Sequence, residues 1–503
     1  MLDDRQSRRT APRTLVVGGG IGGLSAALRL QSAGHDVTII DTHPWPGGKM
    51  RTVPSAAGPV DAGPTVLTMR HVFDDLFATS GCSLDDHVTL VQEKLVARHF
   101  WQDGSSLDLT NDHAANAAAI SKFSGPQSAK EYLTFSRESE ELFTQFSEAM
   151  MQASDPRTSE LAKVSLRNPR HLAKLSPFAT LRKLLIRRFS DPRLAQLFGR
   201  YATYVGGSPI ASPALLSLIW HAEVSGVWRV SGGMHRLALA VASRFQALGG
   251  DLRLGEHVKS IDVRHRCVTG LALETGERLS SDNVVFAGDP RALATGLLGD
   301  AVRDIAKQTR TSARSLSARV WSFAAIPKTS LDLAYHNVLF ARSPTSEFED
   351  LAGGAMPHDP TLYICAQDRG TTTSEITAQE RFEIILNAAP LTEAAAKPDE
   401  EALCRQTTFQ TLREFGLHFE PTPQTEALAT PTTYETLFPG SAGALYGQTP
   451  HGMTASLRRP RARTSIRGLY LAGGGTHPGA GVPMAALSGK HAAETILKDL
   501  VST

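Results

Sequence analysis

The chain is poor in cysteine, has no long apolar run and carries almost no net charge. Its four cysteines, Cys82, Cys267, Cys365 and Cys404, are scattered through 503 residues, which excludes a zinc knuckle or a disulfide framework and predicts reduced thiols in a cytoplasmic setting. No apolar run reaches the length of a membrane span, and the polar start MLDDRQSRRTAPR lacks the apolar core of a signal peptide. The net charge of +2 gives no support to nucleic-acid binding. These features do not exclude a protein that binds a membrane surface peripherally.

The length and composition are those of a globular protein of two or three domains. Hydrophobic residues make up 41% and charged residues 20%, which argues against a disordered or coiled-coil chain. Segments typical of cofactor binding lie at both ends of the chain and near its middle. We therefore predict a discontinuous nucleotide-binding domain from residues 1–82, 223–290 and 446–503, with a substrate domain inserted as 83–222 and 291–445.

The start of the chain predicts a β-α-β unit, the opening of a Rossmann-type α/β fold. Residues 13–17 (RTLVV) form a short apolar run that ends at glycine, which is typical of a buried parallel strand. Residues 24–33 contain no helix breaker and are followed by Gly34, as expected at the end of a helix. Residues 37–40 (VTII) predict the second strand.

The glycine pattern between this strand and helix predicts a dinucleotide site. In Gly18-x-Gly20-x-x-Gly23, the first glycine allows the tight turn, the second lets the backbone approach a pyrophosphate, and the third lets the helix pack on the strand. The helix N-terminus then attracts the anion. Asp41 ends the second strand, where an acid accepts hydrogen bonds from a ribose diol. A purely structural glycine turn is the less favoured alternative.

A second glycine turn follows at once. Residues 46–51 (PGGKMR) contain Gly48 and Lys49, where a simple NAD-binding unit would continue into a helix. Extra phosphate or ribityl contacts would explain this turn and favour FAD over NAD. An ordinary loop with a solvated lysine explains it equally well.

The pattern of expected helices and strands changes along the rest of the chain. Residues 83–222 look mostly helical, whereas the pattern from residue 251 onward turns to strands. A hairpin is expected in 267–288 with its turn at Thr275–Gly276. A last strand at 468–474 leads through a glycine-rich turn into a helix from about Pro483.

Several of these segments together resemble the bacterial FAD-dependent carotenoid desaturases, the phytoene desaturase family. The similar segments are GGGIGGLSAALRLQSAGHDVTIID, PGGKM, DAGPTVLT (61–68), VGGSP (205–209), GVWRVSGGMHRL (226–237), LYGQTPHG (445–452) and RRPRARTSIRGLYLAGGGTHPGAGVPMAALSGKHAA (458–493). The resemblance covers nearly the whole chain, and GGGTHPGAGVP is highly specific. It implies an amine-oxidase-like flavin fold, in which a Rossmann-type FAD-binding domain carries an inserted mixed α+β substrate domain.

Within that family the chain looks most similar to the hydroxyneurosporene desaturases, the 1-hydroxycarotenoid 3,4-desaturases of photosynthetic bacteria. This similarity lies in residues 47–78, 97–109 and 481–490. It implies formation of a C3–C4 double bond in 1-hydroxylated acyclic carotenoids of the hydroxyneurosporene or methoxyneurosporene type. A phytoene desaturase or a flavin amine oxidase is an alternative, although the THPGAGVP run does not supply an amine oxidase's aromatic cage. A carrier protein of the same fold would not need both an intact glycine cradle for the pyrophosphate and an intact C-terminal loop facing the flavin.

The resemblance also implies which residues hold FAD. Gly18, Gly20 and Gly23 would cradle the pyrophosphate and Asp41 the adenosine ribose, while Val258 would offer its backbone to the adenine. The positions expected around the flavin ring, ribityl chain and phosphates are Gly48, Lys49, Asp61, Gly63, Pro64, Thr65, Gly474, Thr476, His477, Gly479, Val482, Pro483 and Met484. Asp41 replaces the commoner Glu and Lys49 the commoner Arg, which weakens bidentate contacts without removing them.

The sequence singles out three candidates for a catalytic role and no metal ligands. Asp61 and His451 are possible bases, but Asp61 more readily caps backbone N–H groups in the DAGPT turn. His477 better fits a flavin-loop residue than a base. Arg167 would orient the substrate, although surface charge explains it more simply. Desaturation needs a dry apolar tunnel and at most one weak base, so none of these assignments is required by the chemistry.

A basic segment predicts a membrane surface contact. Residues 157–188 hold nine Lys or Arg and one acid, and Ser176–Pro177 predicts the start of an amphipathic helix. A core helix with a solvated basic back is the equal alternative. We expect a cytoplasmic enzyme that is peripheral on the inner membrane, takes its carotenoid from the bilayer and passes electrons to quinone or oxygen.

Overall fold

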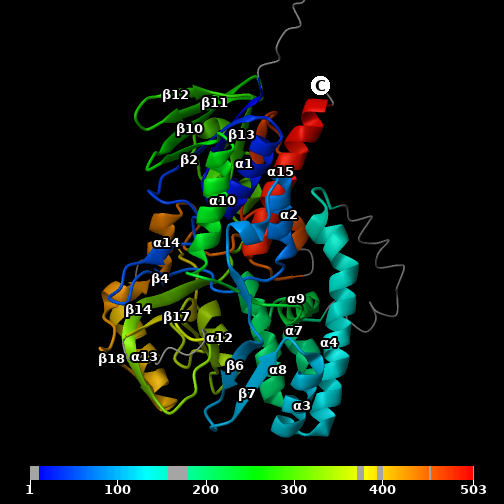
Figure 1. Ribbon diagram of the computed structural model, residues 1–503, viewed down its shortest axis with the longest axis vertical. Helices are drawn as coiled ribbons and strands as arrows, with labels where there is room; N and C mark the ends of the chain where they lie inside the picture. Colours follow the sequence, from blue (N-terminus) through cyan, green and yellow to red (C-terminus); the bar gives the residue numbers. More distant parts are fainter. Residues whose placement is uncertain (1–10, 157–178, 371–378, 393–399, 453–454, 502–503) are drawn as a thin grey trace, which may run out of the picture.

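The computed structural model describes residues 11–156, 179–370, 379–392, 400–452 and 455–501 (Figure 1). A five-stranded parallel sheet forms its first layer, in the order β20-β13-β1-β2-β9. Its strands are β1 (Arg13–Val17), β2 (Asp36–Asp41), β9 (Asp251–Leu254), β13 (Asn283–Phe286) and β20 (Leu469–Leu471). The predicted β-α-β unit is confirmed, and strands distant in sequence complete its sheet.

Helices cover this sheet and share one core with it. The helices are α1 (Ile21–Ser32), α2 (His71–Thr79), α10 (His235–Ala247) and α15 (Val482–Val501). Figure 1 shows the first and last of them side by side. Leu24 and Leu28 of α1 and Ala492 and Ile496 of α15 are all 0% exposed in this core. The two ends of the chain are therefore packed together, as the discontinuous arrangement requires.

A small antiparallel sheet packs against the face of the parallel sheet that is opposite to these helices, where Ile261 and Leu271 share a core with Leu15 and Val17. It consists of β10 (Val258–Arg264), β11 (Cys267–Leu273) and β12 (Arg278–Ser280). The predicted hairpin turn at Thr275–Gly276 is present, and Gly276 has a φ of +91° that favours glycine.

The second layer is a larger, mostly antiparallel sheet in the order β18-β14-β17-β16-β15-β6-β7, with β19 also paired to β14. Its strands are β6 (Leu95–Phe100), β7 (Ser106–Thr110), β14 (Ser317–Thr329), β15 (His336–Leu339), β16 (Leu362–Ala366), β17 (Glu380–Ala388), β18 (Leu417–Glu420) and β19 (Leu428–Ala429). Helix α13 (Glu400–Glu414) shares a core with this sheet.

The expectation that 83–222 is mostly helical was wrong for residues 90–110. β5 (Leu90–Gln92) pairs with β8 (Trp228–Val230), and β6 and β7 complete the larger sheet. β6 lies parallel to β15, with Arg98 opposite Asn337. A partner so far along the chain leaves no local signal, because strand pairing depends on tertiary contacts.

A helical layer flanks the larger sheet at the lower right of Figure 1. Its elements are α3 (His113–Ser124), α4 (Pro126–Phe146), α7 (Leu181–Arg188), α8 (Pro192–Gly199), α9 (Leu218–Val224), the π-helix η2 (Ser147–Gln152) and the 3-10 helix η3 (Arg200–Val205). Aromatic residues fill its core, with Tyr132, Phe198 and Trp220 at most 1% exposed.

Helix α7 begins at Leu181, with Thr180 as its N-cap. The predicted start at Ser176–Pro177 and the basic residues at 157–174 lie outside the described residues. Among the described helices, none is both long and apolar enough to cross a membrane. The predicted domain boundaries remain a prediction.

Candidate active site

A cavity of about 1400 Å³ is lined by the loops of the parallel sheet, by the larger sheet and by the helical layer. Backbone makes much of its wall at one end, which we call the glycine end: Gly18, Gly20, Gly22, Gly47, Gly48, Gly473, Gly474 and Gly475. Side chains make the wall at the other, which we call the helical end: Phe143, Phe146, Arg200, Tyr204, Glu223 and Phe340. One continuous space thus joins two walls of different chemistry.

The three glycines of the first motif have different structural roles, and two of them line the cavity. Gly18 has a φ of +106° and donates its N–H to the carbonyl oxygen of Ile40 at 2.8 Å. A Cβ on Gly20, the N-cap of α1, would meet no atom within 4 Å, whereas a Cβ on Gly23 would lie 2.0 Å from the Gly18 carbonyl oxygen. Gly20 therefore leaves the cavity open at the helix N-terminus. Gly23 does not line the cavity and permits the packing of α1.

Asp41 lines the cavity at the end of β2 and already holds the loop beside it. Its Oδ2 accepts a hydrogen bond from the N–H of Gly19 at 2.6 Å. Its Oδ1 accepts from the N–H of His43 at 2.8 Å. A carboxylate has about four acceptor positions, so Asp41 retains capacity for a ribose hydroxyl.

The second glycine turn brings Lys49 into the cavity wall. Gly48 has a φ of +58°, and a Cβ there would lie 3.1 Å from the Gly20 Cα. The Lys49 Nζ donates to the carbonyl oxygen of Leu445 at 2.5 Å and lies 5.4 Å from the centre of the Phe438 ring. Burial lowers the pKa of Lys49 to about 8. The lysine is therefore not the solvated surface residue of the alternative interpretation.

A second buried cation, Arg459, faces the cavity and was not predicted. Its guanidinium donates to the carbonyl oxygens of Tyr446 and Gly474 at 2.9 Å each and of Gln448 at 3.1 Å. Burial lowers its pKa to about 10. The only sequence signal was the basic run at 458–463 next to the glycine-rich loop.

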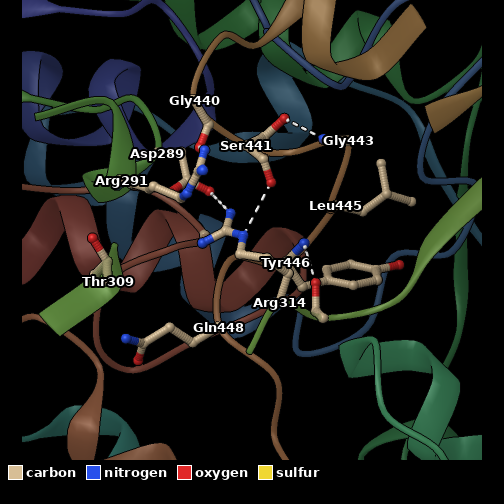
Figure 2. A network of polar contacts seen from close by, with 12 residues as sticks. Asp289, Arg291, Thr309, Arg314, Gly440, Ser441, Gly443, Leu445, Tyr446 and Gln448 are labelled. Carbon is tan, nitrogen blue, oxygen red and sulfur yellow. Dashed lines mark hydrogen bonds and ion pairs between the residues drawn. The ribbon is translucent and has the colours of Figure 1, made fainter. Parts of the chain in front are cut away.

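Asp289 lines the cavity between these cations but has its own partners, which Figure 2 shows. Its Oδ2 is paired with Arg314, and its Oδ1 accepts from the N–H of Arg291 at 2.9 Å. The Nε of Arg314 also donates to the carbonyl oxygen of Ser441 at 3.0 Å. The charge of Asp289 is thereby balanced, which leaves Lys49 and Arg459 as cations that hydrogen-bond only to carbonyl groups among the described residues.

The C-terminal loop places most of its predicted residues in the cavity wall. Gly474, His477 and Gly479 line it, whereas Thr476 is 0% exposed and donates its hydroxyl to the carbonyl oxygen of Ala472. His477 Nε2 donates to the carbonyl oxygen of Ala153 at 2.9 Å, and burial lowers its pKa to about 4. The neutral ring is thus held in place as part of the loop.

The first turn of α15 also borders the cavity, through Val482, Pro483 and Met484. A helix N-terminus carries a partial positive charge. It therefore stabilises negative charge on a group placed there.

The remaining predicted cofactor residues also lie in the wall, with one exception described next. Gly63, Pro64, Thr65 and Val258 line the cavity. A Cβ on Gly63 would lie 2.0 Å from the carbonyl oxygen of Lys49, so only glycine allows this close approach.

Asp61 does not line the cavity. Its Oδ2 accepts from the N–H of Met234 at 2.7 Å, next to the start of α10, and its own N–H and carbonyl are bound by Gln367 at 3.0 and 3.1 Å. A Cβ on Gly233 would lie 2.7 Å from Asp61 Oδ2. The carboxylate thus binds backbone N–H groups, but at the start of α10 and not in its own DAGPT turn as the structural alternative expected. It is not placed to take a proton from a molecule in the cavity.

His451 has its Nε2 occupied. This nitrogen accepts a hydrogen bond from the N–H of Ser208 at 2.9 Å, so in the neutral ring Nδ1 carries the proton. Burial lowers the pKa of His451. It could accept a proton only by losing its bond to Ser208. Arg167, the third candidate, lies outside the described residues.

Sequence reasoning missed the polar residues of the helical end. Tyr204 accepts from the guanidinium of Arg200 at 2.7 Å and donates to Glu223 Oε1 at 2.9 Å. Glu223 is 3% exposed, and its Oε2 has no hydrogen-bond partner in the part of the chain that the structure describes. No motif links these residues, because they come from η3 and α9.

A second polar group adjoins Thr65. The Tyr363 hydroxyl lies 2.7 Å from Thr65 Oγ1 and 2.6 Å from His336 Nδ1. Burial lowers the pKa of His336 to about 3, so this histidine is neutral. Tyr363 lines the cavity and connects the wall near the glycine end with the larger sheet.

The glycine end fits a flavin nucleotide. Bare backbone at Gly20 and Gly474, where a Cβ would meet nothing within 4 Å, leaves room beside the N-terminus of α1. Lys49 and Arg459 supply positive charge for phosphates, and the first turn of α15 supplies a positive helix end for the ring.

Comparisons with known proteins show the family of the chain. The model of the flavin containing amine oxidoreductase family matches residues 21–497. The hydroxyneurosporene desaturase of Cereibacter sphaeroides is 51% identical over 98% of this chain and 99% of its own. The protein of the same name from Rhodobacter capsulatus is 48% identical over 98% of this chain and 99% of its own.

A solved structure shares the fold at low identity. An oxidoreductase from Methanosarcina mazei matches with a TM-score of 0.58 and 16% identity, over 97% of this chain and 100% of that one. The predicted flavin fold is confirmed by these matches. The chain is therefore a member of the flavin containing amine oxidoreductase family, similar over almost its whole length to hydroxyneurosporene desaturases.

Proposed function

We propose that this protein introduces the C3–C4 double bond into 1-hydroxylated acyclic carotenoids, of the hydroxyneurosporene or methoxyneurosporene type, in the carotenoid biosynthesis of a photosynthetic bacterium. The observation that carries the proposal is the single cavity that joins the glycine end to an apolar helical end, in a chain 51% identical to a hydroxyneurosporene desaturase. A long apolar substrate and a flavin nucleotide need one shared space, because hydride transfer requires direct contact.

FAD is the flavin that we assign to the glycine end. The cavity wall continues past the N-terminus of α1 to Asp41 and Val258, which supports binding of an adenosine as well as a flavin. Gly18 and Gly20 would admit the pyrophosphate, and Lys49 and Arg459 would balance its charge.

The reaction takes two hydrogens from neighbouring carbons. FAD, when bound, supplies the two-electron acceptor that takes one hydrogen with its electron pair. The cation left on the substrate is allylic to the polyene and delocalised, and the second hydrogen leaves as a proton. The chain's task is therefore to position the C3–C4 bond and exclude water, without strong acid or base catalysis.

The helical end is suited to this task. Apolar side chains make much of its wall and exclude water: Phe143, Phe146, Phe189, Leu215, Ile219 and Phe340. Asp61 lies outside the cavity, and His451 Nε2 is already bonded to Ser208. We therefore propose none of the described side chains as the base that takes the proton.

Helix α7 is the proposed point of entry from the membrane. Arg182 and Ile186 line the cavity, and Ile186 is 50% exposed. Lys183 on the same helix is also exposed. An exposed apolar residue flanked by cations favours contact with anionic lipid. We propose a cytoplasmic enzyme peripheral on the inner membrane, with quinone or oxygen as the electron acceptor.

The test is a liposome assay with FAD in which 1-hydroxyneurosporene and phytoene are offered in parallel. Products are separated by chromatography and identified by absorption, since each added conjugated double bond shifts the spectrum to the red. Conversion of the hydroxylated carotenoid, without conversion of phytoene, is expected. Conversion of phytoene alone would make the protein a phytoene desaturase, and oxidation of amines alone would make it an amine oxidase.

A further inference from the structure

A desaturase that acts at C3–C4 of a 1-hydroxycarotenoid must accommodate a hydroxyl close to the reacting bond. Only the C2 methylene separates the carbon that carries the hydroxyl from C3. The hydroxyl therefore enters the apolar cavity together with the reacting carbons. A buried hydroxyl without a hydrogen-bond partner is destabilising, so the cavity wall needs a polar group there.

At the helical end, a buried carboxylate oxygen of the described residues accepts no hydrogen bond. Glu223 lies on α9 and is 3% exposed, and its Oε1 accepts from Tyr204 at 2.9 Å. Its Oε2 accepts no hydrogen bond within the described ranges, although the Tyr201 hydroxyl lies beside the carboxylate and interacts with it. An unpaired carboxylate oxygen in an apolar wall is unfavourable unless a ligand pairs it, because buried polar groups are almost always hydrogen-bonded.

Two neighbours hold Glu223 in place. Tyr204 and Arg200 form a chain in which the guanidinium donates to the phenol at 2.7 Å and the phenol donates to Glu223. Arg200 supplies the balancing positive charge, and its Nε is also unpaired within the described ranges. All three residues line the cavity. This arrangement fixes the direction of the free Oε2 without occupying it.

Another buried carboxylate of the wall provides a contrast. Glu347 is 2% exposed and also lines the cavity, but both of its oxygens are occupied. Its Oε1 accepts from Asn387 at 2.8 Å and its Oε2 from the N–H of Thr361 at 3.3 Å. Glu347 is therefore satisfied by the protein itself, whereas Glu223 is not.

The position of Glu223 also agrees with the short separation between hydroxyl and reacting bond. Tyr204 and Tyr363 pack against the same core of the helical layer, and the Tyr363 hydroxyl lies 2.7 Å from Thr65 Oγ1. Thr65 is among the residues expected beside the flavin ring. The Glu223 cluster thus lies on the side of the helical end that is nearest to the predicted ring position.

We propose that Glu223, held by Tyr204 and Arg200, accepts the O–H of the substrate's 1-hydroxyl and so favours hydroxylated carotenoids over those that have no O–H to donate, methoxyneurosporene included. This inference rests on the proposed function, because it names the recognition group of the same site. Glu223 is a specificity-determining residue in this scheme and takes no part in the removal of hydrogen.

The experiment compares kcat/KM for 1-hydroxyneurosporene and for neurosporene, which lacks the hydroxyl, in FAD-containing liposome assays. The variants are Glu223→Leu and Glu223→Gln, with Glu347→Gln as the matched control. Loss of one buried hydrogen bond to a charged group changes such a ratio by about tenfold to a hundredfold. We expect the wild-type preference for the hydroxylated substrate to fall by that factor in Glu223→Leu, less in Glu223→Gln, and to stay in Glu347→Gln.

Flavin absorbance and the melting temperature of each variant report whether it is folded and loaded. If Glu223→Leu does not fold, Tyr204→Phe replaces it, since this change removes the phenol that orients Glu223 and should lower the same ratio about threefold or more. An unchanged ratio in a loaded Glu223 or Tyr204 variant would overturn the inference. A wild-type enzyme that converts no hydroxylated carotenoid would instead overturn the proposed function.

Discussion

The glycine end and the helical end of the cavity are built from different material. At the glycine end the wall is largely backbone, held open by residues that have no side chain, such as Gly20 and Gly474. At the helical end the wall is side chains, and its polar groups, Arg200, Tyr204 and Glu223, come from two helices. A backbone site tolerates little change in conformation, whereas a side-chain site can be altered one contact at a time.

The most damaging change should be Gly23→Ala at the glycine end. The new Cβ would lie 2.0 Å from the Gly18 carbonyl oxygen, so α1 must move away from the loop that it packs against. Overpacking of this kind lowers the free energy of unfolding by about 3 kcal/mol or more. Thermal melting checks the prediction, with Gly353→Ala as the control, since its Cβ would meet no atom closer than 3.4 Å. Equal melting temperatures would contradict it.

Gly20→Ala should separate folding from flavin binding. Its Cβ meets no atom of the protein within 4 Å, so the melting temperature of the apoprotein should stay unchanged. The methyl group would instead occupy space proposed for the pyrophosphate, and we expect the FAD dissociation constant to rise about tenfold or more. Titration followed by flavin fluorescence measures it. Normal FAD affinity would place the phosphates elsewhere.

Lys49 should make flavin binding depend on pH. Burial lowers its pKa to about 8 in the free protein, and phosphates nearby would favour the charged form. Binding then takes up a proton above that pH, so FAD affinity should fall as the pH rises through about 8. Lys49→Met should bind FAD about tenfold more weakly below pH 8 and lose this dependence. The control is Lys490→Met, because Lys490 lies near Asp75 on the surface side of α15.

A smaller effect is expected where the helical end meets the surface. Ile186→Asp on α7 replaces an apolar side chain that is 50% exposed, and it should weaken binding to anionic liposomes about threefold to tenfold. FAD content should not change. Leu403→Asp is the matched control, because Leu403 is 49% exposed on α13, away from the cavity wall. Equal losses in both variants would remove the special role of α7.

The smallest effect is expected for His451→Gln. The amide oxygen of Gln can still accept from the N–H of Ser208, which is the contact that His451 Nε2 makes now. Activity should stay within about threefold and its pH profile should not move. A loss of a hundredfold or more with intact FAD content would restore His451 as a base.

The sequence made the glycine end predictable because backbone requirements leave local patterns. Gly18, Gly20 and Gly23 have fixed spacing, and a strand and helix on either side confirm their context. Local patterns also predicted the hairpin turn at Gly276 and the helix that begins at Val482. Each of these features depends on neighbours within a few residues.

The helical end was not predictable in the same way. Glu223 meets Arg200 and Tyr204 only after η3 and α9 pack together, and Tyr363 joins Thr65 from a strand of the other sheet. The sequence shows that Arg459 is charged but not that it is buried, since burial depends on the whole fold. For the same reason β6 was mistaken for part of a helical region, because its partner β15 follows far along the chain.

The pairing of β20 with β13, and of α15 with α1, has a consequence for biosynthesis. Strand β20 spans Leu469–Leu471, so the parallel sheet stays incomplete until the ribosome has passed residue 471. The helical layer, which ends its sequence at Val224, leaves the ribosome long before then. A nascent chain thus holds the helices of the cavity wall before it holds the last glycine-rich loop at the other end. Cofactor insertion would then be a late, post-translational event, and flavin starvation would leave a folded but colourless apoprotein.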